Sequence, residues 1–189
     1  MAGADHLGEP VMDASALVEA LPDNITIRLL GADDPIPALT ALLHRAYAPL
    51  AAKGLRYSAT HQSDDVTRKR IAQGECFVAT SEGAICGTIL FRNAGNTRGS
   101  PWNDRSDVSS FGQFAVEPAL QRRGLGRRLI ALVEDRAIAS GARELALDTA
   151  EPATHLIAWY AGLGFRFVEY AQWTHTNYRS VILSKTLPL

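Results

Sequence analysis

One short stretch of the chain combines glycines with a concentration of positive charge. It is the end of the stretch from Ser109 to Arg128, where residues 121–128 contain two glycines beside four arginines: Gly124, Gly126, Arg122, Arg123, Arg127 and Arg128. An apolar run ending at 114–116 precedes the glycines and helix-period apolar positions follow them, which predicts a strand, a loop and a helix start. Glycines let a backbone approach a ligand, and the free N–H groups and dipole of a helix start favour anions. We therefore expect this loop to bind a polyanion such as a pyrophosphate.

The common nucleotide-binding motifs do not describe this loop. A Rossmann fingerprint needs a third glycine, and a Walker loop needs a lysine followed by serine or threonine. Residues 121–128 contain neither feature. On the Gly-x-Gly pattern alone, the alternative is a helix start whose arginines only face solvent.

A second pattern lies downstream of the loop. The run 144–149 alternates as a strand, and 154–163 has the periodicity of a helix that Gly164 stops. This helix carries the string Tyr160-Ala-Gly-Leu-Gly164-Phe165. The two patterns together predict a β-α-β-α-β succession in the second half of the chain.

Both patterns resemble those of the GNAT family of acyl-CoA N-acyltransferases. Gln121, Gly124 and Gly126 match the family's Gln/Arg-x-x-Gly-x-Gly/Ala loop, which grips the CoA pyrophosphate, and Tyr160 begins a string similar to its Tyr-x-x-x-Gly-Phe signature. The resemblance covers roughly residues 25–187. It implies an α/β (α+β) GNAT fold, in which a mixed, mostly antiparallel central sheet of six to seven strands is flanked by about four helices and parts at its centre to hold acyl-CoA.

The resemblance also implies acetyl-CoA as co-substrate and assigns residues to it. Many family members carry an Asn seven residues ahead of the signature tyrosine, where this chain has Ala153, so Thr149 or His155 is expected to replace one hydrogen bond to the cofactor. The central strand, the loop and the next strand then supply the cofactor-binding residues: Phe114, Ala115, Val116, Gln121, Arg122, Arg123, Gly124, Leu125, Gly126, Arg127 and Thr149.

Acyl transfer to an amine needs three roles filled. The amine must lose a proton, the thioester carbonyl must be polarised, and the departing thiolate must be stabilised or protonated. By resemblance, Tyr160 is expected near the CoA sulphur as general acid; the alternative is a helix tyrosine with a merely hydrogen-bonded hydroxyl. The strand before the loop lacks the carboxylate that some members use as base, which leaves several candidates: Gln113 through a water, Glu117, Asp107, Asp148 and His175.

Length and composition suit one soluble globular domain. The chain has 189 residues, 47% of them hydrophobic, without the 18-residue apolar run that a membrane span needs. Residues 1–22 read as a poorly ordered extension, in which 11–21 is a candidate short helix, and 23–189 as the acyltransferase domain. A net charge of −1 gives no general attraction to nucleic acid or to an anionic membrane, so neither is expected as a partner.

The two cysteines are expected to be free. Cys76 and Cys86 fall on strands predicted at 76–80 and 85–91, which a turn at Glu82-Gly83 joins. That turn places Cys86 opposite Ala79, so the two thiols point to opposite faces of the sheet. Free thiols without a secretion signal fit the cytoplasm. The five histidines lie far apart in sequence, so we expect no metal.

The resemblance places the acceptor pocket beside the first two helices and the C-terminal connector. The positions of interest there are Arg56, Tyr57, His61, His175 and Tyr178, with ordinary surface or core-edge roles as the alternative. We expect an N-acetyltransferase that moves an acetyl group from acetyl-CoA to a primary amine of a small molecule by direct attack on the thioester. A non-catalytic acyl-CoA-binding protein and a peptide or protein N-acetyltransferase are the alternatives. Since similar proteins frequently form dimers, a homodimer is also expected.

Overall fold

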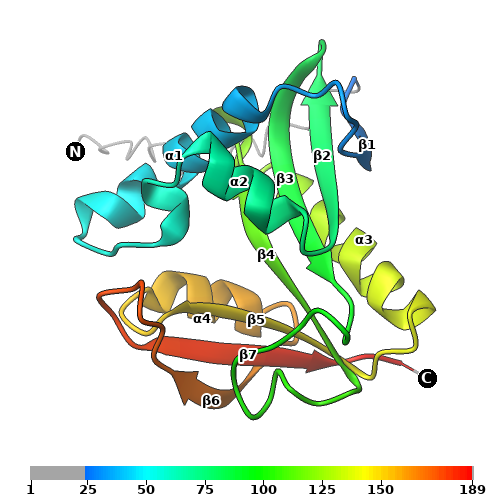
Figure 1. Ribbon diagram of the computed structural model, residues 1–189, viewed down its shortest axis with the longest axis vertical. Helices are drawn as coiled ribbons and strands as arrows, with labels where there is room; N and C mark the ends of the chain where they lie inside the picture. Colours follow the sequence, from blue (N-terminus) through cyan, green and yellow to red (C-terminus); the bar gives the residue numbers. More distant parts are fainter. Residues whose placement is uncertain (1–23, 189) are drawn as a thin grey trace, which may run out of the picture.

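Seven strands form one mixed sheet in the computed structural model, which describes residues 24–188 (Figure 1). The strand order is β1-β2-β3-β4-β5-β7-β6, and every neighbouring pair is antiparallel except β4 and β5. The sheet confirms the predicted fold class. The extension expected at 1–22 and the candidate helix at 11–21 lie outside the described residues. The strands are β1 Thr26–Leu29, β2 Glu75–Ser81, β3 Ala84–Arg92, β4 Val108–Val116, β5 Glu144–Ala150, β6 Arg166–Ala171 and β7 Ser180–Thr186.

Helices cover both faces of this sheet. Helix α1 buries Leu39, Leu42 and Leu43 on one face, while α3 buries Leu129 and Val133 on the other, each at the helical spacing that makes one apolar stripe. Within residues 24–188, every helix is too short or too polar to cross a lipid bilayer. The helices are α1 Ile36–Ala52, α2 Asp64–Ile71, α3 Leu125–Ala139 and α4 Thr154–Ala161, with single 3₁₀ turns η1 Ser58–Thr60 and η2 Pro118–Leu120.

The β2–β3 hairpin forms as predicted, but its register differs by one residue. Glu82 and Gly83 make the turn with φ of 51° and 80°, the left-handed conformations that a two-residue hairpin requires. Ala79 pairs with Gly87 rather than Cys86, because a bulge adds one residue to β3. The expectation that Cys86 lies opposite Ala79 is therefore wrong. Its consequence still holds, since both cysteines are free and buried in different core clusters.

The central strands part, as the family resemblance implies. β4 and β5 pair only where Val108–Ser110 lies beside Glu144–Ala146. Beyond that point β4 continues to Val116 and β5 to Ala150 without pairing to each other. A bulge close to this point puts one residue of β3 against two of β4, and Gln113 takes a left-handed φ of 45° there. The parted strands leave one edge of β4 open to a ligand.

Candidate active site

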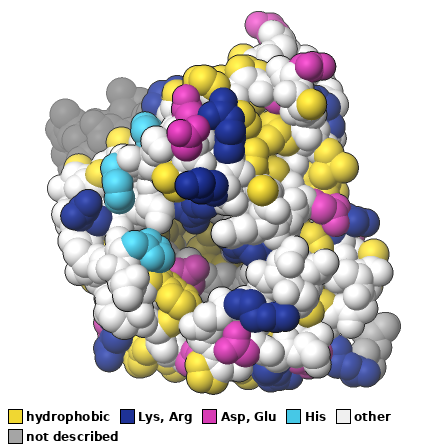
Figure 2. All heavy atoms as spheres, in the orientation of Figure 1, with side chains coloured by type: hydrophobic (Ala, Val, Ile, Leu, Met, Phe, Trp, Pro, Cys, Tyr) yellow, Lys and Arg dark blue, Asp and Glu magenta, His cyan; other side chains and the backbone are white. Residues whose placement is uncertain are grey.

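A cleft of about 1430 Å³ occupies the gap between the parted strands. Its lining comes from both halves of the chain: the end of α1, η1, α2, β3, β4, the start of α3, β5, α4 and the β6–β7 connector. Figure 2 shows this face of the molecule hollowed near its centre, with basic side chains around the hollow and an acidic one on its lower edge. The cleft is therefore polar and charged as well as apolar.

The glycine loop meets the cleft through its backbone. Gly124, with φ of 96°, is the N-cap of α3, and Arg122 two residues earlier also has a left-handed φ of 62°. Left-handed residues in such a turn aim successive N–H groups into one concavity, which binds anions. The first N–H groups of α3 add to it because they have no partner inside the helix. This geometry fits the pyrophosphate expected from the sequence.

Most of the predicted cofactor residues lie on the cleft. Leu125 is fully buried in the core, so only its backbone faces the loop, and Arg123 is not part of the lining. Gln121 donates a hydrogen bond from Nε2 to Val116 O at 3.1 Å, which ties the loop to β4. The predicted residues that line the cleft are Phe114, Ala115, Val116, Gln121, Arg122, Gly124, Gly126, Arg127 and Thr149.

Gly126 has a packing reason to be glycine. A Cβ there would lie 3.2 Å from Phe114 Cζ and 3.7 Å from the ring of Trp159. Those two rings stack with their centroids 6.0 Å apart and form part of the cleft wall. A side chain at this position would push the wall into the space beside the loop. The glycine therefore keeps the cleft open where the cofactor is expected.

Tyr160 forms part of the cleft wall, and its hydroxyl has no hydrogen-bond partner among the described residues. The residue is 7% exposed and packs against Phe111 and Phe165. Its hydroxyl makes no hydrogen bond with residues 24–188, although the residue lines the cleft. Burial raises the pKa of Tyr160 well above its ordinary value of 10.0. A hydroxyl that stays protonated can give a proton to a leaving group but cannot act as a base near neutral pH.

Sequence and structure comparisons agree on the family. The family described as Acetyltransferase (GNAT) matches residues 38–165. The chain belongs to the GNAT acetyltransferase family. A curated relative, the S-(2-succino)cysteine N-acetyltransferase of Bacillus subtilis (strain 168), is 29% identical over 129 residues, which cover 67% of this chain and 76% of that protein.

Solved structures share the fold at lower identity. A GNAT family acetyltransferase from Elizabethkingia anophelis with acetyl-CoA bound has a TM-score of 0.61 and 21% identity, covering 88% of this chain and 100% of its own. The ribosomal-protein-S18-alanine N-acetyltransferase from Escherichia coli has a TM-score of 0.63 and 23% identity, covering 87% and 95%. Family membership makes this chain an acetyl-CoA-dependent acetyltransferase, and it favours an enzyme over the non-catalytic alternative.

The candidates for the general base separate into two groups in this acetyltransferase. Glu117 pairs with Arg45 at 2.7 Å and Asp107 with Arg105 at 2.7 Å, and neither carboxylate lines the cleft. Asp148, His175 and Gln113 do line it. Trp173 Nε1 and Ser180 Oγ donate to Asp148 Oδ2 at 3.0 and 3.4 Å, while Oδ1 accepts no hydrogen bond from the described residues. The structure thus keeps Asp148 oriented with one oxygen available to a ligand.

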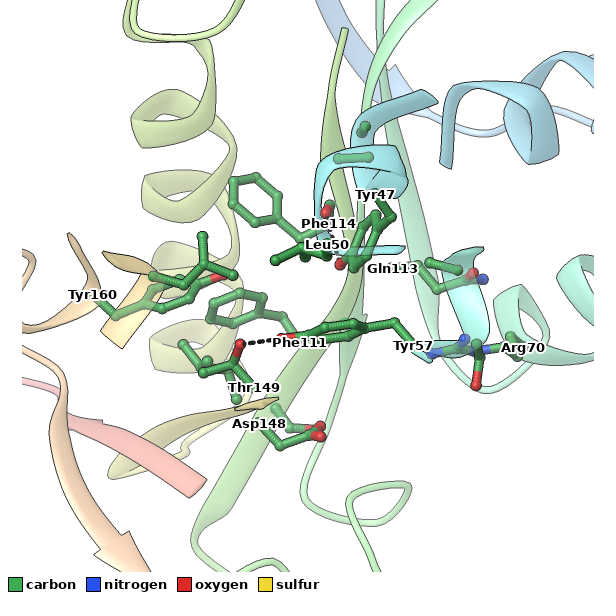
Figure 3. A pocket seen from close by; sticks show the side chains of 18 of the residues that line it. Tyr47, Leu50, Tyr57, Arg70, Phe111, Gln113, Phe114, Asp148, Thr149 and Tyr160 are labelled. Atoms are coloured by element: carbon green, nitrogen blue, oxygen red, sulfur yellow. Dashed lines mark hydrogen bonds between the residues drawn. The ribbon is translucent and has the colours of Figure 1, made fainter. Parts of the chain in front are cut away.

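Tyr57 lies across the middle of the cleft, between its two ends (Figure 3). Its hydroxyl lies 2.9 Å from Thr149 Oγ1 and accepts from Ala150 N at 2.9 Å. Burial raises the pKa of Tyr57, so this hydroxyl also stays protonated. The hydroxyl of Thr149 already forms a hydrogen bond with Tyr57. His155 also lines the cleft, so it is the better candidate to make the cofactor hydrogen bond that Ala153 cannot make.

The remaining acceptor-side predictions divide in the same way. Tyr178 and His175 line the cleft with Tyr57, whereas Arg56 and His61 do not. Several cleft residues were not predicted, and three of them carry polar groups into the site: Tyr47, Arg70 and Arg92. Tyr47 donates from its hydroxyl to Phe114 O at 3.1 Å, beside the β4 bulge. None of the three belongs to a motif, and each comes from an element that reads as ordinary helix or strand. Only the pairing of β3 with β4 and the packing of α1 and α2 bring them to the cleft.

No cluster of three or more histidine, cysteine or acidic side chains that could hold a metal ion occurs among residues 24–188. In this family the reacting acyl group arrives on acetyl-CoA. The polar groups that the cleft presents to a ligand include the open edge of β4, the hydroxyl of Tyr160 and the carboxylate of Asp148.

Proposed function

We propose that this enzyme transfers the acetyl group of acetyl-CoA to a primary amine of a small molecule. The observation that carries the proposal is a bridge across the acceptor end of the cleft. Asn177 in the β6–β7 connector accepts from Arg56 N at 2.9 Å and donates to Gly54 O at 2.8 Å. A peptide acceptor needs an open groove between the segment at 54–56 and the β6–β7 connector. The bridge joins these two segments and so closes that groove. A small amine does not need that groove.

Aromatic packing supports the same conclusion. The ring of Tyr57 packs on Tyr178 with centroids 4.8 Å apart and on Tyr47 at 5.3 Å, so the bridged segments meet through side chains as well. The Bacillus subtilis relative is named for acetylating S-(2-succino)cysteine, an amino acid, which also favours a small acceptor. The Escherichia coli structural relative is named for a protein substrate, but at 23% identity it informs the fold alone.

The proposed reaction is direct attack of the amine on the thioester. The amine nitrogen forms a bond to the carbonyl carbon, the C–S bond breaks, and the products are the acetamide and CoA. The backbone of β4 at 114–116 polarises the carbonyl, as an oxyanion site does. Tyr160 gives its proton to the departing sulphur and regains one from solvent. Asp148 takes the proton that the amine loses, directly or through a water.

Replacing Asp148 tests the last of these roles. In Asp148→Asn we expect kcat/KM to fall by roughly tenfold or more, because general acid–base groups contribute that much or more to rate. The loss should shrink as the assay pH rises and more of the amine is already deprotonated. His175→Gln is the matched control, since His175 lines the same cleft. If kcat/KM falls equally at every pH in Asp148→Asn, and falls in a pH-dependent way in His175→Gln, the general base is His175 rather than Asp148.

A panel of acceptors tests the proposed function as a whole. Acetyl-CoA-dependent release of free thiol would be followed with amino acids, S-(2-succino)cysteine, polyamines, aminoglycosides, aryl amines and short peptides. Release with one class of small amine, well above that with peptides, is the expected result. A preference for peptides would overturn the small-molecule assignment. Binding of acetyl-CoA, seen as a raised melting temperature, without release from any acceptor would contradict catalysis on these classes.

Two accompanying properties are also proposals. The two free cysteines fit a reducing compartment, which supports a cytoplasmic location; fractionation of the source cells tests it. A homodimer is proposed from the family resemblance, and size-exclusion chromatography with light scattering over a range of concentrations tests it.

A further inference from the structure

Two guanidinium groups line the same cleft, act on each other electrostatically and have no carboxylate at ion-pair distance among the described residues. Arg70 comes from the last turn of α2 and Arg92 from the end of β3, and both line the cleft. Neither lies within ion-pair distance of an acidic side chain of residues 24–188. Other arginines of the domain do have such partners: Arg28, Arg45, Arg68, Arg105, Arg136, Arg166 and Arg179. The pair in the cleft is therefore unlike these surface arginines.

Neutral amides hold the two arginines in place. Arg70 donates from Nη1 to Gln62 Oε1 at 2.8 Å, and Gln62 donates in turn to Gln113 Oε1 at 2.8 Å. Gln62 is 3% exposed, so this link is part of the interior. Arg92 donates from Nε to Gln73 Oε1 at 3.3 Å. Amide oxygens fix a guanidinium without cancelling its charge, so the positive charge of both groups remains available to a ligand.

Strand β4 has a glycine, Gly112, at the point where the guanidinium of Arg92 lies against it. A Cβ on Gly112 of β4 would lie 3.2 Å from both Nη atoms of Arg92. The guanidinium therefore lies directly over the backbone of β4, and a side chain on Gly112 would force it to move by a few tenths of an ångström. This close approach places the charge of Arg92 on the strand that is expected to bind the acyl group.

The arrangement has an electrostatic cost while the cleft is empty. Burial lowers the pKa of Arg70, and burial together with the charge of Arg70 lowers the pKa of Arg92 to about 10, although the carboxylate of Asp148 acts on both groups in the opposite direction. Two like charges in one partly desolvated site destabilise each other, and an anion between them removes that cost. Figure 3 shows Arg70 and Tyr160 at opposite sides of the cleft, so this anion site is separate from the expected position of the thioester sulphur.

We propose that Arg70 and Arg92 together bind a carboxylate of the acceptor, which makes the acceptor an amino acid or another amine bearing a carboxylate. The assignment rests on the proposed function. A guanidinium offers two parallel N–H groups that match the two oxygens of a carboxylate. Asp148 lines the same cleft and offers an oxygen to the ammonium group of such a molecule. The two arginines and Asp148 thus complement a molecule that carries both charges.

Paired substrates test the inference. Thiol release would be measured for free amino acids and for the corresponding amino acid amides, which keep the amine and lose the α-carboxylate charge. The wild-type enzyme should prefer acid over amide by at least tenfold in kcat/KM. In Arg70→Gln and in Arg92→Gln the acid should lose at least tenfold and the amide much less, so the preference falls to near one. Arg68→Gln, on the same helix but outside the cleft lining, should keep the wild-type preference.

A subtler variant keeps both charges. Gly112→Ala should displace the Arg92 guanidinium and lower the acid-to-amide preference while leaving the affinity for acetyl-CoA within twofold. If acids and amides react equally well in the wild-type enzyme, the inference is wrong although the proposed function stands. If the arginine variants weaken acetyl-CoA binding instead, the pair belongs to the co-substrate and the inference is again wrong. If no free amine is acetylated and peptides are, the proposed function itself fails.

Discussion

Charged side chains are partnered differently at the two ends of the β4–β5 seam, which is closed where the two strands pair and open where they part. At the closed end, the nearly buried carboxylate of Glu144 accepts from Arg166 at 2.8 Å, Ser184 at 2.7 Å and Thr186 at 2.9 Å. At the open end, Arg70 and Arg92 meet no carboxylate at ion-pair distance among the described residues, and Tyr160 makes no hydrogen bond. A fully partnered charge thus lies where the two strands pair, and two guanidinium groups from α2 and β3, without a carboxylate partner, line the cleft where the strands part.

This difference separates stability from function along one seam. A buried charge is normally paired, because an unpaired one costs free energy. Where the chain leaves charged groups unpaired beside a cleft, a ligand is the partner that would restore the balance. We therefore expect substitutions at the closed end to change the free energy of unfolding, and substitutions at the open end to change binding or rate.

The largest effect is expected in the glycine loop. Gly124→Glu should weaken acetyl-CoA binding by roughly 100-fold or more, because it adds backbone strain of about 1–2 kcal/mol and a like charge at the anion site. Gly124 has φ of 96°, which a residue with a side chain rarely adopts. Calorimetric titration with acetyl-CoA measures the change. Unchanged affinity would show that the pyrophosphate binds elsewhere.

Gly141→Glu is the matched control for this substitution. Gly141 also has a left-handed φ, 80°, but it follows α3 at its far end, has open space around it and does not line the cleft. The strain should therefore lower the melting temperature in both variants, while only Gly124→Glu loses acetyl-CoA. Equal losses of binding would mean that strain in α3, rather than charge at the loop, disrupts the site.

The second effect concerns rate at the open end. Tyr160→Phe should lower kcat by at least about tenfold, since general acids contribute that much or more. Its affinity for acetyl-CoA and its free energy of unfolding should change little, because the hydroxyl has no hydrogen-bond partner among the described residues. Tyr170→Phe, half exposed on β6 and outside the cleft lining, is the control. An unchanged kcat in Tyr160→Phe would remove this hydroxyl from the mechanism.

The two sides of the cleft also differ in how far the sequence predicts them. The cofactor side follows from local patterns: Gly124 and Gly126 in a loop between a strand and a helix, and Tyr160 in a helix that ends at glycine. These features depend on backbone conformations that favour glycine, so the glycines in the sequence indicate where they occur. The mixed sheet and its parting at the centre came from the family resemblance, and the structure confirms both, whereas the order of the strands is known from the structure alone.

The acceptor side could not be predicted in the same way. Arg70 reads as one of three basic residues that end a helix, and Arg92 as the polar end of an apolar strand. Their presence in one cleft depends on the packing of α2 and on the close approach of Arg92 to Gly112, which are tertiary features. The β3 bulge shows the same limit, since one inserted residue moved the expected partner of Ala79. Spacing along the chain does not reveal where a strand will bulge.

The third effect tests the closed end. Burial alone would raise the pKa of Glu144, but hydrogen bonds from Arg166, Ser184 and Thr186 outweigh it and hold the pKa below its ordinary value of 4.5. Glu144→Gln should therefore lower the free energy of unfolding by about 1–3 kcal/mol at pH 7. Because the folded-state pKa is depressed, the stabilisation is present above pH 4.5 and is lost as the pH falls through the folded value.

Urea unfolding at pH 7 and at pH 3.5 measures this prediction. The difference between wild type and Glu144→Gln should be large at pH 7 and smaller at pH 3.5, while kcat at a permissive temperature stays within twofold. Glu151→Gln removes an exposed carboxylate that pairs with Arg179, and it should change stability much less. A large fall in kcat for Glu144→Gln without a loss of stability would break the division between the two ends.

The smallest effect is expected for Glu117, whose position in the sequence made it a candidate base. Its pair with Arg45 is partly exposed, at 27% and 50% of the side chains, and such pairs contribute about 0.2–1 kcal/mol. Glu117→Gln should change stability by that much and kcat by less than about twofold, with no change in the pH profile, because Glu117 does not line the cleft. Comparison of Glu117→Gln with Asp148→Asn shows which carboxylate takes the proton of the amine: the one that lines the cleft or the one that lies next to the glycine loop. A loss of the pH-dependent limb in Glu117→Gln would mean that the Arg45 pair opens during turnover, and that a charge partnered in the resting enzyme can still belong to the reaction.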